Sequence, residues 1–268
     1  MRRVGIVALG ILPASLARAQ SCHVTAPTAD DERGLRLVAR ADTAGFDTER
    51  DEGHYQGLFF GVRFAYDIVS VSSSLPVYRI VDDGVPNTGI GDVPLAARVR
   101  LATFDEDRIR LGAGLSTTFP SGDPEKELGM GHVMLMPVVF GSRRSGRFEL
   151  GSELAYVQAL GSREAPEHQH HHHEPDTSDG TSPLVDPMNR SELDPLLAAR
   201  FDLGAPWTVR AGAYGGFPVG SIDGTARAIA FVGLEVSVGR FGTRIQGEMP
   251  FVGDPFTGKL VLELSTRL

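Results

Sequence analysis

The sequence predicts an all-β chain that forms an antiparallel transmembrane β-barrel of about 12 strands after removal of a signal peptide. Three observations support this fold class. The N-terminus resembles an export signal, apolar and polar residues alternate with a period of two over most of residues 34–268, and short turns alternate with long loops along the chain.

The N-terminus has the three parts of a secretory signal peptide. Arg2 and Arg3 form a basic region, residues 4–12 form a short apolar run, and Ala19 ends a small-residue cleavage site. The run is too short to cross a hydrocarbon core, which requires about 20 apolar residues in a helix. We therefore expect residues 1–19 to be removed, residues 20–33 to form a flexible mature N-terminus, and residues 34–268 to form the barrel.

Composition limits the classes of protein that are compatible with the sequence. The formal net charge is −8, so no basic stripe is available to replace phosphate counterions, and we expect no nucleic-acid partner. A single cysteine cannot form an internal disulfide. No segment after residue 19 has 18 consecutive apolar residues, which excludes a helical membrane protein. A soluble β-domain and a β-barrel remain.

The period-two pattern assigns a face to each side chain. In the last predicted strand, Leu260, Leu262 and Leu264 fall on one face, and Lys259 and Glu263 fall on the other. In a barrel the apolar face contacts lipid and the polar face lines the lumen. An earlier segment repeats the pattern, and its apolar face carries Leu58, Phe60, Val62, Phe64 and Tyr66.

Taken in order, the same pattern gives twelve strands joined by alternating short and long connections. They lie near 34–41, 55–66, 68–78, 91–103, 108–119, 131–140, 147–159, 193–203, 207–217, 226–238, 241–249 and 258–268. Short turns are expected at 66–67, 104–107, 141–146, 204–206 and near 239. An even number of strands brings both termini to the short-turn rim, which is periplasmic in outer-membrane barrels.

Aromatic residues near the predicted strand ends suit the two girdles that barrels place at the membrane interfaces. These residues are Tyr55, Tyr66, Phe104, Phe119, Phe201, Trp207, Phe217, Phe241 and Phe251. A soluble β-sandwich is the alternative fold, because its outer faces are also charged. A sandwich gives no reason for short turns on one rim and long loops on the other, so we favour the barrel.

Two stretches resemble a known family. TGIGDVPLAARVRL (88–101) has a G-x-G-D strand opening, and GLSTTFPSGDPEKELGMGHVMLMPVVFGSR (114–143) has a T-x-P-S-G-D strand exit followed by G-x-G. Their order resembles that of the outer-membrane family named for the MetA pathway of phenol degradation. The resemblance implies a transporter-like β-barrel that passes small molecules.

Alternation assigns a set of charged residues to the lumen. Those we expect to line a pathway are Arg98, Arg100, Arg110, Arg210, Glu149, Glu153, Glu235 and Glu263. The arginines would favour anionic or phenolic-oxygen solutes. Opposite charges packed across a narrow lumen could instead plug it, because twelve strands enclose more space than eight but less than an open porin. The sequence leaves both states open.

A histidine-rich segment lies within residues 160–192, on the rim expected to face outside the cell. Its candidate metal ligands are His168, His170, His171, His172 and His173. Neutral imidazoles suit Zn(II), Cu(II) and Ni(II), but adjacent histidines cannot form a rigid preformed tetrahedron, so we expect loose binding. We expect no required cofactor.

Two functions are compatible with these features. The first is a channel or transporter for small molecules, aromatic or anionic ones included; the second is a surface metal-binding protein with the barrel as its anchor. We expect no enzyme, because the chain has no G-x-S-x-G elbow and few histidines outside the histidine-rich segment. The expected partners are bacterial outer-membrane lipid, the barrel assembly machinery and a small solute.

Overall fold

The structure is a computed structural model that describes residues 33–47, 52–82, 84–106, 108–126, 128–161, 189–220, 225–253 and 256–268. The signal peptide, residues 20–32 and the five candidate histidines lie outside these ranges, and the expectations for them remain predictions. Within the described ranges, no helix is both long enough and apolar enough to span a membrane.

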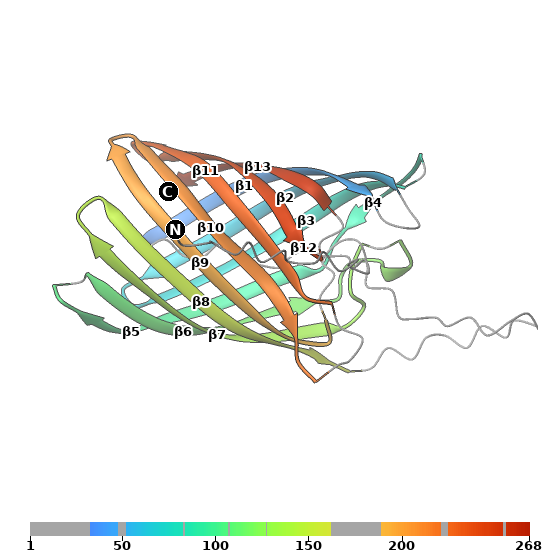
Figure 1. The fold of residues 1–268 in the computed structure, drawn as a ribbon, viewed down its shortest axis with the longest axis horizontal. Coiled ribbons are helices and arrows are strands. Elements are labelled where there is room, and N and C mark those ends of the chain that lie inside the picture. Colours follow the sequence, from blue (N-terminus) through green and yellow to red (C-terminus); the bar gives the residue numbers. More distant parts are fainter. Residues whose placement is uncertain are drawn as a thin grey trace, which may run out of the picture.

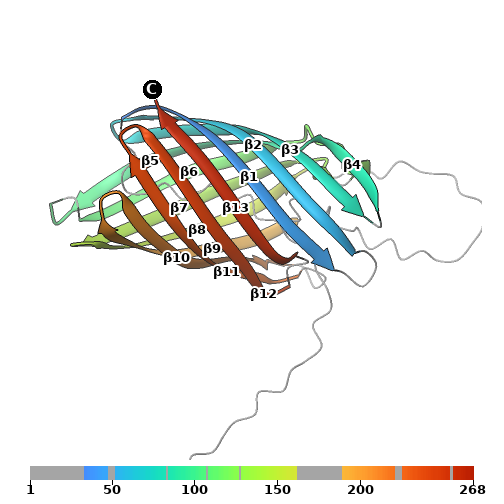
Figure 2. The ribbon, with the colours of Figure 1, turned by 90° about the horizontal axis from the view of Figure 1, so that it is seen from above.

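Twelve antiparallel strands form a closed barrel, as predicted (Figure 1). The wall strands are β1 (Gly34–Asp47), β2 (Glu52–Tyr66), β3 (Val69–Asp82), β5 (Val93–Phe104), β6 (Ile109–Phe119), β7 (Val133–Ser145), β8 (Phe148–Leu160), β9 (Ser191–Gly204), β10 (Trp207–Pro218), β11 (Arg227–Val238), β12 (Phe241–Val252) and β13 (Phe256–Arg267). Each strand pairs with the next in the wall, and β13 pairs with β1 to close the ring. Figure 2 shows β13 and β1 side by side at this closure.

A short strand, β4 (Val85–Ile90), is the element that sequence analysis missed. It pairs with the long-loop end of β3, and β5 continues the pairing farther down β3. At the break between β4 and β5, the Gly91 N–H donates to the Pro76 carbonyl at 3.0 Å. A side chain at Gly91 would overlap the ring of Tyr78, so this break requires glycine. β4 and β5 therefore act as one interrupted strand.

The two rims differ as expected. At the short-turn rim, Asp67 (φ 53°), Gly146 (φ 60°) and Gly239 (φ 58°) adopt the left-handed backbone conformation that tight hairpin turns require. Both chain ends of the barrel lie on this rim, where the Leu268 N–H donates to the Leu35 carbonyl at 2.9 Å. The longer connections lie on the opposite rim, which we call the long-loop rim.

The outward face is a continuous apolar surface, which rejects the sandwich alternative. The predicted outward residues of β2 and β13 are between 41% and 64% exposed: Leu58, Phe60, Val62, Phe64, Tyr66, Leu260, Leu262 and Leu264. In a sandwich these side chains would form the core, and a soluble protein rarely exposes an apolar patch of this extent. Lipid is the environment in which the surface is stable.

The expected aromatic girdle is confirmed except at one residue. Eight of the nine aromatics are exposed near strand ends, whereas Tyr55 is fully buried inside the barrel. Its ring lies 5.8 Å from that of Tyr78 and 5.3 Å from that of Phe256. The prediction for Tyr55 is wrong because Tyr55 lies an odd number of residues from outward Leu58, and alternation turns it inward.

Candidate functional site: the charged half of the lumen

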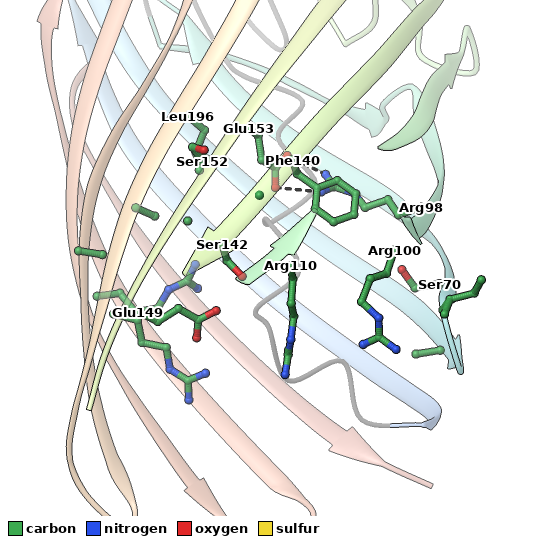
Figure 3. A pocket seen from close by; sticks show the side chains of 18 of the residues that line it. Ser70, Arg98, Arg100, Arg110, Phe140, Ser142, Glu149, Ser152, Glu153 and Leu196 are labelled. Carbon is green, nitrogen blue, oxygen red and sulfur yellow. Dashed lines mark hydrogen bonds and ion pairs between the residues drawn. The ribbon is translucent and has the colours of Figure 1, made fainter. Parts of the chain in front are cut away.

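Six of the eight predicted lumen residues line one cavity in the short-turn half of the barrel (Figure 3). The cavity has a volume of about 120 Å³. Its predicted lining residues are Arg98 and Arg100 on β5, Arg110 on β6, Glu149 and Glu153 on β8, and Arg210 on β10. Successive inward positions on neighbouring strands bring these side chains together, which period-two alternation requires.

One pair of these residues is joined within the cavity. Arg98 donates two hydrogen bonds to the Glu153 carboxylate, at 2.8 and 3.0 Å, and both side chains are less than 10% exposed. The Arg98 guanidinium carbon also lies 5.4 Å from the centre of the Phe140 ring, within cation–π distance. β5 and β8 are not neighbours in the wall, so the pair is a brace between two separate strands. Arg98 is therefore less available to a solute than its neighbours.

Three other arginines of the cavity, Arg100, Arg110 and Arg210, form no ion pair with a carboxylate of the described residues. Arg100 donates to the backbone carbonyl of Asp67 at 3.1 Å. In the part of the chain that the structure describes, neither Arg110 nor Arg210 has a carboxylate at ion-pair distance. Arg200, an inward residue of β9, also lines the cavity, and its Nε atom lies 3.7 Å from an Asp202 carboxylate oxygen. The cavity consequently presents positive charge to whatever enters it.

The structure places the remaining two predicted residues, Glu235 and Glu263, outside the lining of this cavity. Glu263 accepts a hydrogen bond from Arg244 at 2.6 Å and lies in a smaller pocket that it shares with Arg40. Glu235 faces Arg244 in the β11–β12 register, and its charge attracts Arg210. Glu235 and Glu263 thus offset the positive charge of arginines that lie beside the cavity.

A second group of ion pairs lies along the inner wall formed by β1, β12 and β13, and it was not predicted from the sequence. Lys259 lies 2.7 Å from the Glu248 carboxylate, which also accepts a hydrogen bond from the Tyr214 hydroxyl at 2.8 Å. Arg40 pairs with Asp42 on the same strand. Alternation identifies the inward face of each strand, but it does not give the register between neighbouring strands that places Glu248 opposite Lys259.

The long-loop half of the lumen is packed with apolar side chains. Tyr55, Ile80 and Leu128 are at most 1% exposed and belong to one cluster with Tyr78 and other inward residues. Leu128 comes from the connection between β6 and β7, which enters the barrel instead of standing above its rim. Apolar side chains fill this half, in place of the opposite charges that the plugged alternative supposed.

Asp92, at the break between β4 and β5, anchors the connection that carries Leu128. Its carboxylate accepts hydrogen bonds from the backbone N–H groups of Gly122 at 2.9 Å and Met130 at 2.7 Å. Burial raises the pKa of Asp92, although both N–H groups and the charge of His132 lower it. Asp92 is thus a single side chain that fixes two points of the inserted connection.

No metal centre of the conventional kind occurs in the described ranges. Among these residues, no three His, Cys, Asp or Glu side chains are grouped so that they could hold a metal ion. The candidate metal ligands His168 and His170–His173 fall in residues 162–188, outside the described ranges. Metal binding by that segment remains a prediction.

The fold and the lumen define a barrel of the transmembrane class, and solved structures share its architecture. The KdgM porin is 8% identical, with 87% of this chain and 99% of that chain covered, at a TM-score of 0.53. KdgM in complex with disordered oligogalacturonate gives a TM-score of 0.54 at the same identity and coverage. The β domain of the Bordetella autotransporter BrkA is 12% identical, with 88% of this chain and 100% of that chain covered, at a TM-score of 0.52.

These similarities show the fold alone. A porin and an autotransporter domain match about equally well, so architecture does not choose between their functions. No protein-family model matches the chain, the phenol-degradation family included, and no curated protein matches it. The barrel implied by the family resemblance is present, and membership of that family remains a prediction.

Proposed function

We propose that the chain is an outer-membrane channel for small anionic solutes, including aromatic compounds that carry a carboxylate or phenolate. The arginine-rich cavity is the observation that carries this proposal. Five arginines and three carboxylates line it, an excess of two positive formal charges. In a confined site of low dielectric, such an excess attracts anions more strongly than it would in water.

The lining also suits an aromatic ring. Phe140 presents an apolar face beside the charged groups, and Leu196 and Ala198 add further apolar surface. An aromatic anion would place its charged oxygen toward Arg110 or Arg210 and its ring against these side chains. An inorganic anion would contact the arginines alone, so aromatic anions should have the longer residence time in the cavity.

The outer membrane is the location that fits the outward face. Exposed apolar side chains surround the barrel, and exposed aromatics lie near the strand ends. The predicted export signal directs the chain to the same compartment. For solute to cross, the inserted connection between β6 and β7 must move, because Leu128 and its neighbours fill the long-loop half.

Ion selectivity in planar bilayers tests the proposal. The refolded chain should give conductance steps whose reversal potential in a salt gradient shows anion preference. Replacing Arg110 with Gln should lower that preference, whereas Arg143→Gln should leave it unchanged. Arg143 is a matched control because it lies on the neighbouring strand, one register position from Arg110, and is exposed on the other face. Absence of conductance steps, or equal effects of the two changes, would contradict the channel.

A further inference from the structure

A group of soft metal ligands lies inside the long-loop half of the lumen, apart from the charged cavity. The segment from Met130 to Met136 has the pattern M-x-H-x-M-x-M. Met134 is fully buried and Met130 is 7% exposed, and both pack in one cluster with Met136, Val157 and Ala159. The His132 Nε2 atom lies 3.0 Å from the Met134 Sδ atom.

The backbone holds these side chains in place. Met134 is an inward residue of β7, whose pairing with β6 and β8 fixes its direction. Met130 is fixed by the hydrogen bond from its N–H to Asp92, at 2.7 Å. A thioether sulfur only accepts hydrogen bonds, so in the ion-free protein the His132 Nε2–H donates to the Met134 Sδ atom. Binding of a metal would require the ring proton on Nδ1, which leaves the Nε2 lone pair for the ion.

The chemistry of the three groups selects one class of ion. Thioethers are soft, uncharged ligands that bind Cu(I), and imidazole accepts the same ion, whereas Ca(II) and Mg(II) require oxygen. The apolar neighbours Val157 and Ala159 offer no oxygen ligand. Core packing accounts for the buried methionines, and a hydrogen bond accounts for the contact between His132 and Met134. The same two atoms are also ligands for soft metal ions, and a bound ion would replace the hydrogen bond between them.

We propose that His132, Met134 and Met130 form a binding site for a soft monovalent cation, Cu(I) or its chemical analogue Ag(I). The site lies at the end of the lumen nearest the long loops, where the connection between β6 and β7 enters the barrel. The proposal does not depend on anion conduction, because it uses none of the arginines of the charged cavity.

Silver(I) is the probe for the test, since it is not reduced or oxidised in ordinary chloride-free buffer. The refolded full chain is labelled with ¹³C at the methionine methyl groups and titrated with Ag(I) while its NMR spectrum is recorded. The Met130 and Met134 methyl signals should shift and saturate. Met249 is the internal control, because its side chain is 68% exposed on the outward face. A cation bound elsewhere on the chain would leave the two lumen signals unchanged.

Two variants complete the experiment. Met134→Leu conserves side-chain volume and should weaken the Ag(I) affinity reported by the Met130 methyl group by roughly 10-fold or more, the size of effect seen even for outer-shell changes at metal sites. Met249→Leu should leave the affinity unchanged. Equal affinity in wild type and Met134→Leu, or equal shifts at Met249 and Met134, would overturn the proposal. If Met134→Leu fails to fold, silver-edge X-ray absorption of the wild type decides, since a first shell without sulfur also overturns it.

Discussion

The brace between Arg98 and Glu153 makes a quantitative prediction about stability. Replacing Glu153 with Gln keeps the shape of the side chain but removes the charge that accepts two hydrogen bonds, at 2.8 and 3.0 Å. Breaking a buried ion pair by removing one partner costs about 3–5 kcal/mol, because the other charge stays buried. Because the Arg98 side chain is 8% exposed at the cavity, water that enters could partly solvate its charge, so we expect a loss of about 2–4 kcal/mol.

Equilibrium unfolding of the refolded barrel in urea measures this loss. The chain contains one tryptophan, Trp207, and its fluorescence reports departure from lipid without introduced labels. A double variant, Arg98→Met with Glu153→Leu, is the matched control. It removes both charges together and should cost much less than Glu153→Gln, because no charge is left unpaired.

The same change also alters the charge of the cavity. Glu153→Gln releases Arg98 and removes one negative charge, so the anion preference in planar bilayers should increase. A loss of stability below about 0.5 kcal/mol, the range of ordinary surface substitutions, would refute the brace. An unchanged anion preference would show that ions do not pass this pair.

Three further predictions follow from the wall, from Asp92 and from the histidine-rich segment. Leu262→Arg should lower the free energy of unfolding by about 2–4 kcal/mol if the residue lies near the membrane midplane, whereas Glu263→Gln should mainly change conduction. Equal effects of the two changes on stability in urea titrations would show that the two faces of the strand are assigned wrongly. Because burial raises the pKa of Asp92 in the packed lumen, proton uptake favours the packed arrangement. Channel conductance should therefore fall as the pH is lowered through this raised pKa toward the ordinary value of 3.8. The Asp92→Asn change should abolish this pH dependence of conductance. The His132→Asn change is the control for the other group that titrates nearby. Calorimetry should show Cu(II) binding to the mature chain that weakens from pH 7 toward pH 5 as imidazoles with a pKa near ~6.5 become protonated, and unchanged binding after replacement of His168 and His170–His173 by Ala would exclude that segment.

Period-two alternation explains why most of the wall could be predicted from the sequence. A strand in a barrel has only two faces, so one apolar run such as that of Leu260, Leu262 and Leu264 fixes the direction of every other side chain in it. The structure places Arg110 and Glu149, which the same alternation turns inward, in the lining of the charged cavity. The prediction failed at Tyr55 because the aromatic type was given more weight than its position in the alternation.

Alternation could not predict the contacts across the lumen or the extra strand β4. Arg98 and Glu153 are 55 residues apart and lie on strands that do not pair, so their contact depends on the curvature of the closed barrel. The segment 85–90 (VPNTGI) contains proline, asparagine and glycine, which are uncommon in strands, and among the described strands it pairs with β3 alone. Its strand conformation is imposed by β3, so its own residues carry little signal.

The irregular part of the wall and the packed half of the lumen have a common origin at Gly91 and Asp92. In an uninterrupted strand, β4 and β5 would keep regular pairing with β3, and alternation alone would set the direction of Asp92. The break at Gly91 instead brings the Asp92 carboxylate within hydrogen-bond distance of Gly122 and Met130, which holds the connection between β6 and β7 inside the barrel. That connection supplies Leu128 to the apolar cluster, and it packs Met130 against Met134 of β7. Because the Asp92 carboxylate holds Met130, a movement of the connection that opens the long-loop half for a solute should shift Met130 relative to Met134. Occupancy of the proposed cation site should therefore favour the packed state.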